Sequence, residues 1–241
     1  MSGPFQLFGP SHVGALLLTG VGCAIAFQAS RGEQAEAVRK ASGIGFFLFL
    51  AVIYGERFWS GFQPGLDLPL QVCDVVFLVC LVGFWRAWPG SLDLVYFWGL
   101  AGTMQALLTP DVPHGFPSRE FCLFFAGHGL ILLGLTVLLT SRGYRAERAG
   151  PWRAWLALVG YTVLVGSLDL ATGWNYGYLL RKPQQATLLD HLGGWPFYVV
   201  VGLLVALMLF LLLYLPWVVF GRTPNVSPEL TPTPSHHKKR S

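Results

Sequence analysis

Apolar stretches of 18 or more residues recur along this chain of 241 residues and constrain its fold more than any other feature. Each stretch is long enough to cross about 30 Å of hydrocarbon as a helix, and a helix satisfies its own backbone hydrogen bonds in lipid. Only 12% of the residues are charged, which is about half the share typical of a soluble domain. The sequence therefore predicts an all-α, polytopic membrane protein.

Seven transmembrane helices are expected within one transmembrane domain over residues 1–220. The expected spans are 12–30, 42–61, 68–86, 91–109, 119–140, 153–173 and 195–220. The first is interpreted as a retained span, because no basic segment precedes it and no small-x-small cleavage site follows it. Asp67, followed by Leu68 and Pro69, is interpreted as the N-cap that starts the third span. Glycines inside the spans favour close helix packing.

The distribution of basic residues predicts the orientation of the chain. Twelve Lys and Arg lie in the first, third and fifth connections and in the tail, whereas the connections on the opposite side carry only Arg119, Arg181 and Lys182. Because basic residues concentrate on the cytoplasmic side, the N-terminus is expected outside and the C-terminus in the cytoplasm. The Pro-rich, polar tail over 221–241 is expected to be a disordered cytoplasmic segment.

The sixth connection, about 173–194, is the longest and carries aromatic residues at both ends, as is typical of a membrane–water boundary. Thr187 and Asp190 have the spacing of a helix N-cap pair, and Gly193 and Gly194 would end a short helix. We expect this connection to form a lid on the outer face.

Polar side chains within the spans concentrate in the half that this orientation puts outside, while the inner halves are almost purely apolar. At about 1.5 Å per residue, the third span carries its polar groups roughly 6–10 Å below the outer boundary, and His128 lies roughly 14 Å deep. The set comprises Glu56, Arg57, Gln71, Cys73, Asp74, Gln105, His128 and Asp169, with Asn175 just beyond. Ionisable groups at such depth are costly and usually line a cavity or pair. The pattern predicts a cavity that opens to the outer side.

Simpler interpretations exist for several of these residues. Glu56 and Arg57 could be an ordinary boundary pair, and Asp74 could only bond neighbouring helices. A buried cysteine such as Cys73 is usually an inert small hydrophobe. His128 is the strongest indication of function, because histidine is costly within a span unless it has a partner.

Cys73 and His128 together could perform acyl transfer, since an imidazole can take the thiol proton and the thiolate can attack a carbonyl. An ester at that depth would be a lipid, whose phosphate could meet the outer-side cations Arg57, Arg119, Arg181 and Lys182. The four cysteines show no metal-ligand spacing, so no metal or cofactor is predicted. Hydrolase, nucleotide-binding and zinc-protease motifs are absent, and the placement of the basic residues argues against nucleic-acid binding.

Several segments resemble the bacterial YwaF-like integral membrane proteins. They are Leu68-Pro-Leu-Gln-Val-Cys73-Asp74, Gln105-Ala-Leu-Leu-Thr-Pro110-Asp111, Gly127-His128-Gly129-Leu130, Asn175-Tyr-Gly-Tyr-Leu-Leu-Arg181-Lys182-Pro183 and Leu188-Leu-Asp190-His-Leu-Gly-Gly-Trp195-Pro196. That family is similar to a eukaryotic transmembrane acyltransferase of ether-phospholipid remodelling and, more distantly, to AIG/ADTRP-type hydrolases. The resemblance implies a Cys–His acyl-transfer centre at Cys73 and His128. The third-span motif departs from the family's usual pattern, because Gln71 stands where a histidine is common.

The sequence thus predicts a multi-pass protein of the bacterial inner membrane that acts as a lipid acyltransferase or lipid-ester hydrolase on phospholipid or lysophospholipid. Cys73 would be the nucleophile and His128 the general base. Substrate-binding or orienting groups would come from Glu56, Arg57, Gln71, Asp74, Gln105, Asp169, Asn175 and Arg181. Two alternatives remain: a non-enzymatic protein that binds or transports a lipid or small molecule in its outer cavity, and a structural membrane partner without a cavity.

Overall fold

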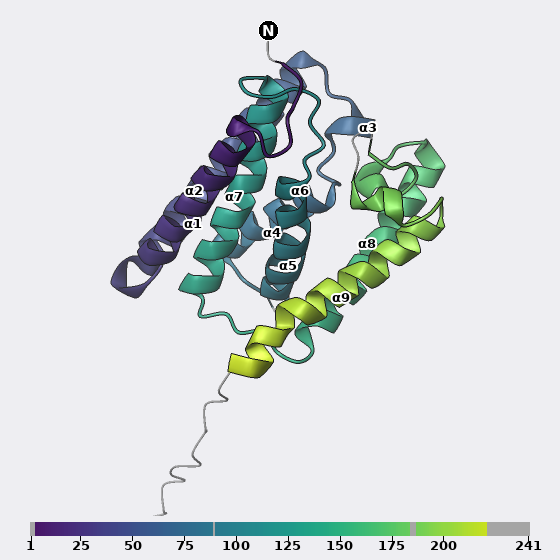
Figure 1. Ribbon diagram of the computed structural model, residues 1–241. Helices are drawn as coiled ribbons and strands as arrows, with labels where there is room; N and C mark the ends of the chain where they lie inside the picture. The colour runs from purple at the N-terminus through teal and green to yellow at the C-terminus, as the bar shows by residue number, and fades with distance from the viewer. Residues whose placement is uncertain (1–2, 89, 184–186, 221–241) are drawn as a thin grey trace, which may run out of the picture.

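The computed structural model, described for residues 3–88, 90–183 and 187–220, is a bundle of helices with no strand in those residues (Figure 1). The main helices are α1 (Pro10–Ala29), α2 (Ala35–Ser60), α4 (Val72–Trp85), α5 (Ser91–Trp98), α7 (Arg119–Ser141), α8 (Gly150–Thr172) and α9 (Phe197–Phe220). The π-helical segment η2 (Gly99–Thr103) joins α5 to α6 (Met104–Leu108). The short elements are η1 (Gly32–Gln34), α3 (Pro64–Asp67), η3 (Tyr176–Tyr178) and η4 (Leu188–His191). The expected all-α class is confirmed, and the predicted tail over 221–241 lies outside the described residues.

Five helical segments among the described residues are long and apolar enough to cross a membrane. They are Pro10–Ala29, Gly32–Ser60, Arg119–Ser141, Gly150–Thr172 and Phe197–Phe220. The third and fourth expected spans are not among them: α4 has 14 residues, or about 21 Å of helix, and the fourth span consists of α5, the π-helical segment η2 and α6. Recurrent apolar helices of this kind are typical of a membrane protein.

The start of the third expected span differs from the prediction. Asp67 does not cap a helix that begins at residue 68; it ends α3, and α4 begins only at Val72. Gln71 is the N-cap of α4 and forms a capping box with Asp74. The Asp67 carboxylate instead accepts a hydrogen bond from the Gln63 N–H at 2.8 Å. The segment between α2 and α4 is therefore a compact loop rather than a helix end.

Helix α4 lies between α2, α5 and α7, and close approach at glycines brings these helices together (Figure 1). A Cβ added to Gly134 of α7 would lie 2.4 Å from Cζ of Phe46 in α2, so only glycine leaves room for that ring. Phe46 in turn stacks on Phe77 of α4 with ring centroids 4.4 Å apart. The expected small-residue packing is thus present here, whereas Gly14 and Gly45 have nothing within 4 Å of an added Cβ.

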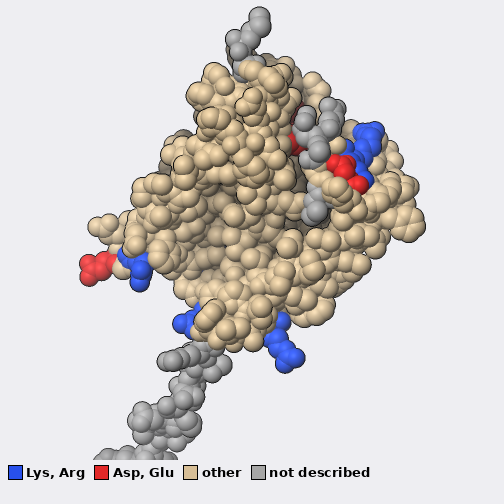
Figure 2. All heavy atoms as spheres, in the orientation of Figure 1, with Lys and Arg blue, Asp and Glu red and all other residues tan. Residues whose placement is uncertain are grey.

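Helices α8 and α9 pack side by side, and α8 also packs against α5 (Figure 1). We call the end of the bundle that holds residue 10 and α3 the upper end, and the end where α9 finishes the lower end. Through its middle, the face drawn in Figure 2 is free of Lys, Arg, Asp and Glu, which gather towards the two ends. This arrangement leaves an apolar band of the kind a bilayer requires.

The inner halves of the expected spans were predicted to be almost purely apolar, but a charged side chain is buried at the lower end of the bundle. Asp93 in the first turn of α5 is 3% exposed. Its carboxylate pairs with Arg153 of α8 at 2.7 Å and accepts a hydrogen bond from the Tyr144 hydroxyl at 2.7 Å. Arg153 also pairs with Glu147 at 3.0 Å. These contacts tie α5, α8 and the connection before α8 together.

Candidate functional site

The N-terminus of α4, which carries Cys73, is fixed by contacts from distant parts of the chain. The Gln71 N–H donates to the Asp74 carboxylate at 3.2 Å, and the Gln71 side-chain oxygen accepts from the Gly177 N–H at 2.8 Å. Gly177 has a φ of +62°, a conformation that favours glycine. The Tyr161 hydroxyl donates to the Leu70 carbonyl at 2.6 Å. The start of α4 is therefore held by both α8 and η3.

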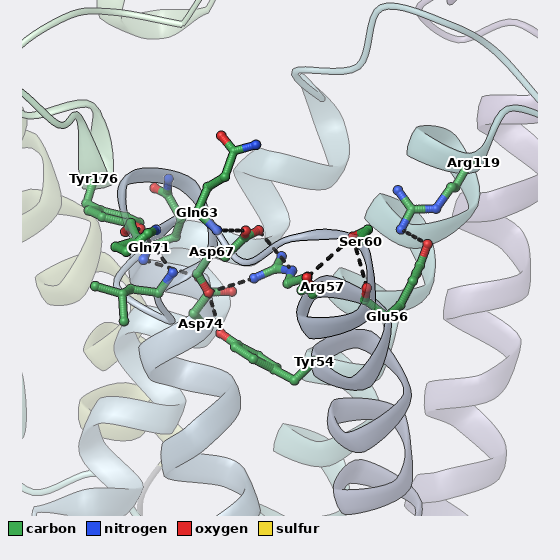
Figure 3. Close-up of polar contacts among 12 residues, drawn as sticks. Tyr54, Glu56, Arg57, Ser60, Gln63, Asp67, Gln71, Asp74, Arg119 and Tyr176 are labelled. Atoms are coloured by element: carbon green, nitrogen blue, oxygen red, sulfur yellow. Dashed lines mark hydrogen bonds and ion pairs between the residues drawn. The ribbon is translucent and has the colours of Figure 1, made fainter.

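The loop before α4 is anchored from two sides (Figure 3). The Tyr176 hydroxyl donates to the Pro64 carbonyl at 2.5 Å and accepts from the Leu68 N–H at 3.0 Å. From α2, Tyr54 and Arg57 both donate to the Asp67 carbonyl, at 3.0 and 2.9 Å. Non-helical backbone at membrane depth must be satisfied by protein or water. These side chains supply such partners.

A backbone carbonyl of α7 determines which ring nitrogen of His128 carries the proton. Its Nδ1 lies 2.8 Å from the Phe124 carbonyl, and a carbonyl oxygen only accepts hydrogen bonds. Nδ1 therefore carries the proton in the neutral ring, which leaves the lone pair on Nε2. The ring also stacks on Phe124, with centroids 4.1 Å apart. Within the described residues Nε2 makes no hydrogen bond, so it is available as a base.

Two cavities meet at this point. The apolar cavity, about 530 Å³, is lined mainly by α4, the α5–α6 region, α9 and the residues after α8. The polar cavity, about 440 Å³, lies between α2, α4, α7 and the loop before α4, and it includes Arg57, Asp67 and Arg119. Four residues line both cavities: Cys73, Asp74, Phe124 and His128. The sequence analysis predicted a single cavity, whereas the structure has two cavities that share these four lining residues.

Other predicted residues divide between this region and its surroundings. Gln71 and Gln105 line the apolar cavity, and Arg57 lines the polar one. Glu56 lines neither cavity and pairs with Arg119 at 2.6 Å, instead of forming a boundary pair with the adjacent Arg57. Arg57 pairs with Asp67 at 3.5 Å.

Asp169, Asn175 and Arg181 line neither of these cavities. Asp169 is fully buried in α8. The Asn175 side chain accepts from the Leu180 and Arg181 N–H groups and donates to the Arg181 carbonyl, all at 2.9–3.0 Å. Arg181 itself donates to the Gly173 carbonyl at 3.2 Å. Asn175 and Arg181 therefore shape the connection after α8.

Sequence reasoning missed the tyrosines that hold the site. Tyr54 and Tyr176 anchor the loop before α4, and Tyr178 donates to the Asp111 carboxylate at 2.9 Å. Burial, together with that hydrogen bond, raises the pKa of the Tyr178 hydroxyl above its usual range. Tyr54 lies near the end of the second expected span, and Tyr176 and Tyr178 follow the sixth, where tyrosine is equally typical of a membrane-boundary aromatic belt. Thr103, whose hydroxyl is buried in η2, carried no signal at all.

The chemistry available is that of a thiol, an imidazole with a free basic nitrogen and the carboxyl group of Asp74 beside two cavities of different polarity. No cluster of three potential metal-ligating His, Cys, Asp or Glu side chains occurs among the described residues. The fold and this site define a multi-pass helical membrane protein with an internal chamber. The family model of the TMEM164 family matches residues 7–214, so the chain belongs to that family. No curated protein and no solved structure matches the chain.

Proposed function

We propose that this protein is a membrane-embedded lipid acyltransferase or lipid-ester hydrolase in which Cys73 is the nucleophile and His128 the general base. The observation that carries the proposal is that these two side chains line both cavities. The tautomer of His128 supports it, because Nε2 is the unprotonated nitrogen in the neutral ring.

The reaction would proceed in two balanced steps. His128 Nε2 takes the proton of Cys73, and the thiolate attacks the ester carbonyl of a lipid. The carbon–oxygen ester bond breaks, a thioester forms on Cys73, and the leaving alcohol takes the proton from His128. The hydroxyl of a lysolipid, or water, then loses its proton to His128 and attacks the thioester. A new ester or a fatty acid leaves, and the thiol regains the proton.

A phospholipid or lysophospholipid would fit the two cavities. The apolar cavity suits a fatty acyl chain, since small residues such as Ala101, Gly102 and Ala206 line it. The polar cavity suits the glycerol and phosphate, because Arg57 and Arg119 both line it. Gln71 and Asp74 would orient the start of α4.

The remaining predicted polar residues would act around the chamber. Gln105 would contact the substrate from the apolar cavity, which it lines. Asn175 and Arg181 would shape the outer connection through their mutual hydrogen bonds. Glu56 would hold Arg119 at the mouth of the polar cavity, and Asp169 would support the end of α8.

The finer topology is part of the same proposal. We propose seven crossings of a bacterial inner membrane, with the N-terminus outside, the connection at 173–194 on the outer face and the C-terminus in the cytoplasm. Helix α4 and the α5–α6 region would be the two short crossings, enclosed by the longer helices. The distribution of basic residues supports this orientation. A relationship to the YwaF-like and AIG/ADTRP-type proteins belongs to the same proposal.

The test is formation of an acyl-enzyme. Full-length protein in phospholipid nanodiscs, supplied with a phospholipid that carries an alkyne-tagged acyl chain, should gain one hydroxylamine-sensitive acyl group on Cys73. Cys73→Ala should abolish the label, and His128→Gln should slow labelling by about 100-fold or more. Cys80→Ala is the matched control, because Cys80 is fully buried in the same helix and lines neither cavity.

Absence of acylation in the wild-type protein would overturn the enzymatic proposal. If lipid still copurified with the protein, and Ala206→Phe displaced it from the apolar cavity, the non-enzymatic binding function would take its place.

A further inference from the structure

The helical segment formed by α5, η2 and α6 changes its hydrogen-bonding pattern where it packs against α4. Residues Gly99–Thr103 form a π-helical turn between α5 and α6, and no proline lies within it. Single π turns inside α-helices occur frequently at functional sites. Gly99 opens this turn where packing is tight, because an added Cβ would lie 2.7 Å from a Leu135 methyl group. The turn is therefore held by the packing around it.

The last residue of this turn, Thr103, has an unusual hydroxyl. Thr19, Thr109, Thr136 and Thr172 each donate a hydrogen bond to the backbone carbonyl four residues earlier, at 2.7–3.0 Å. Thr103 is 0% exposed, and its hydroxyl makes no hydrogen bond within the described part of the chain. A buried donor without a partner costs about 1–3 kcal/mol. The Thr103 hydroxyl therefore lacks the backbone partner that these four threonines have.

The register between two antiparallel segments puts this hydroxyl next to Cys73. An added Cβ on Gly99 would lie 3.5 Å from a Val76 methyl group, so these two residues face each other. Thr103 in η2 and Cys73 in α4 each lie about one helical turn from that contact, towards the upper end. The Thr103 hydroxyl and the Cys73 thiol are indeed neighbours, although no hydrogen bond satisfies the hydroxyl.

We propose that Thr103 is a positioning residue that donates its hydroxyl hydrogen to the thiolate of Cys73 when that thiolate forms. This inference rests on the proposed function of Cys73 as a nucleophile. A neutral thiol is a weak acceptor, so the hydroxyl has little to gain in the resting protein. Once His128 removes the proton, the sulfur carries a full negative charge in a site of low polarity. A nearby donor that needs no reorganisation then stabilises it strongly.

Replacing Thr103 by valine, which has the same shape, separates an effect on the acylation rate from an effect on stability. Valine has the shape of threonine and lacks the hydroxyl, so Thr103→Val would remove an unpaired buried donor and leave stability unchanged or improved. The proposal instead predicts that acylation of Cys73 by the tagged phospholipid slows by about 10- to 100-fold, the range expected for a hydrogen bond to a charged group. Thr103→Ser keeps the hydroxyl and should retain a rate within about threefold of wild type.

The experiment compares the initial rate of Cys73 acylation in nanodiscs for wild type, Thr103→Val, Thr103→Ser and the control Thr136→Val. Thr136 is a threonine of α7 whose hydroxyl already has a backbone partner, so its substitution should not slow acylation. Thermal unfolding of each variant verifies that the bundle is intact. Loss of rate in Thr103→Val with rescue by Thr103→Ser, at unchanged or higher thermal stability, supports the inference.

Two results would overturn the inference while leaving the proposed function in place. One is a Thr103→Val protein that is acylated as fast as wild type, and the other is a Thr103→Ser protein as slow as Thr103→Val. A wild-type protein that is never acylated on Cys73 overturns the proposed function itself.

Discussion

The Tyr176 hydroxyl is the principal link between the connection after α8 and the loop before α4, so its removal should loosen the start of α4. Tyr176 is 1% exposed and bonds two backbone groups, the Pro64 carbonyl and the Leu68 N–H. Phenylalanine would fill the same space and leave both groups without this partner. Tyr176→Phe therefore isolates the hydrogen bonds from the packing.

The expected size of the effect follows from the surroundings of the two groups. Pro64 is exposed, so water can replace the hydroxyl at its carbonyl at little cost. The Leu68 N–H is only partly exposed, and an unpaired buried donor costs about 1–3 kcal/mol. We expect Tyr176→Phe to destabilise the protein by about 1.5–3 kcal/mol, which corresponds to roughly 10- to 100-fold in the unfolding equilibrium.

The assay combines a global and a local measurement. Unfolding in mixed micelles gives the change in free energy, and hydrogen exchange of the peptide that covers 64–70 reports the Leu68 amide. Tyr198→Phe is the matched control, because Tyr198 is also buried but donates a single hydrogen bond, to the Tyr178 carbonyl. It should cost about 1 kcal/mol and leave exchange at 64–70 unchanged. A Tyr176→Phe protein with a loss below about 0.5 kcal/mol and unchanged exchange would refute the reasoning.

Three further predictions concern packing and charge. Gly134→Ala should destabilise the bundle by about 1–3 kcal/mol in thermal unfolding, because its Cβ would lie 2.4 Å from Cζ of Phe46; an unchanged melting temperature would mean that the ring moves freely. Arg153→Met should lower the free energy of unfolding by about 2–4 kcal/mol, because it leaves the buried carboxylate of Asp93 without its ion pair. Glu147→Gln, at an exposed carboxylate, should change it by less than about 0.5 kcal/mol. Burial, together with the hydrogen bond to Asp93, raises the pKa of Tyr144 above its usual range. At alkaline pH the folded chain therefore keeps the phenolic proton that the unfolded chain loses. That stabilisation is complete below about pH 10 and is lost as pH rises further. Tyr144→Phe should therefore flatten the fall in unfolding free energy at alkaline pH. An identical slope of unfolding free energy against pH in both proteins would contradict this.

Much of the helical framework could be predicted from apolar length alone. The ranges of α1, α7, α8 and α9 follow within about three residues from runs whose composition requires a helix in lipid. Helix α2 ends as predicted but begins at Ala35 instead of residue 42, because its first turns carry charged side chains that an apolar run does not include. The third expected span was too long by four residues at its start, because Asp67, Leu68 and Pro69 have the residue types of a helix N-terminus. Tertiary contacts decided otherwise: Arg57 and Tyr176 bind the backbone of this segment.

The candidate site was predicted by the cost of polar groups in lipid, which is a local property. That argument led to Asp74 and His128, the reactivity of a thiol beside an imidazole added Cys73, and all three line both cavities. It could not separate these residues from Asp169 or Glu56, since depth along a helix does not say which way a side chain faces. Nor could it find Thr103, because threonine is common in membrane helices, where its hydroxyl usually bonds its own backbone.

The shortness of α4 has a consequence for bilayers of different thickness. Long helices that face lipid respond to a thicker or thinner membrane by tilting or by distorting the lipid around them. Helix α4 is packed among α2, α5 and α7, and hydrogen bonds to protein fix its first residues. Hydrophobic mismatch would therefore act on the surrounding helices, while the vertical position of Cys73 relative to the loop above it stays constant. The chamber would keep its internal geometry in membranes whose lipid composition varies.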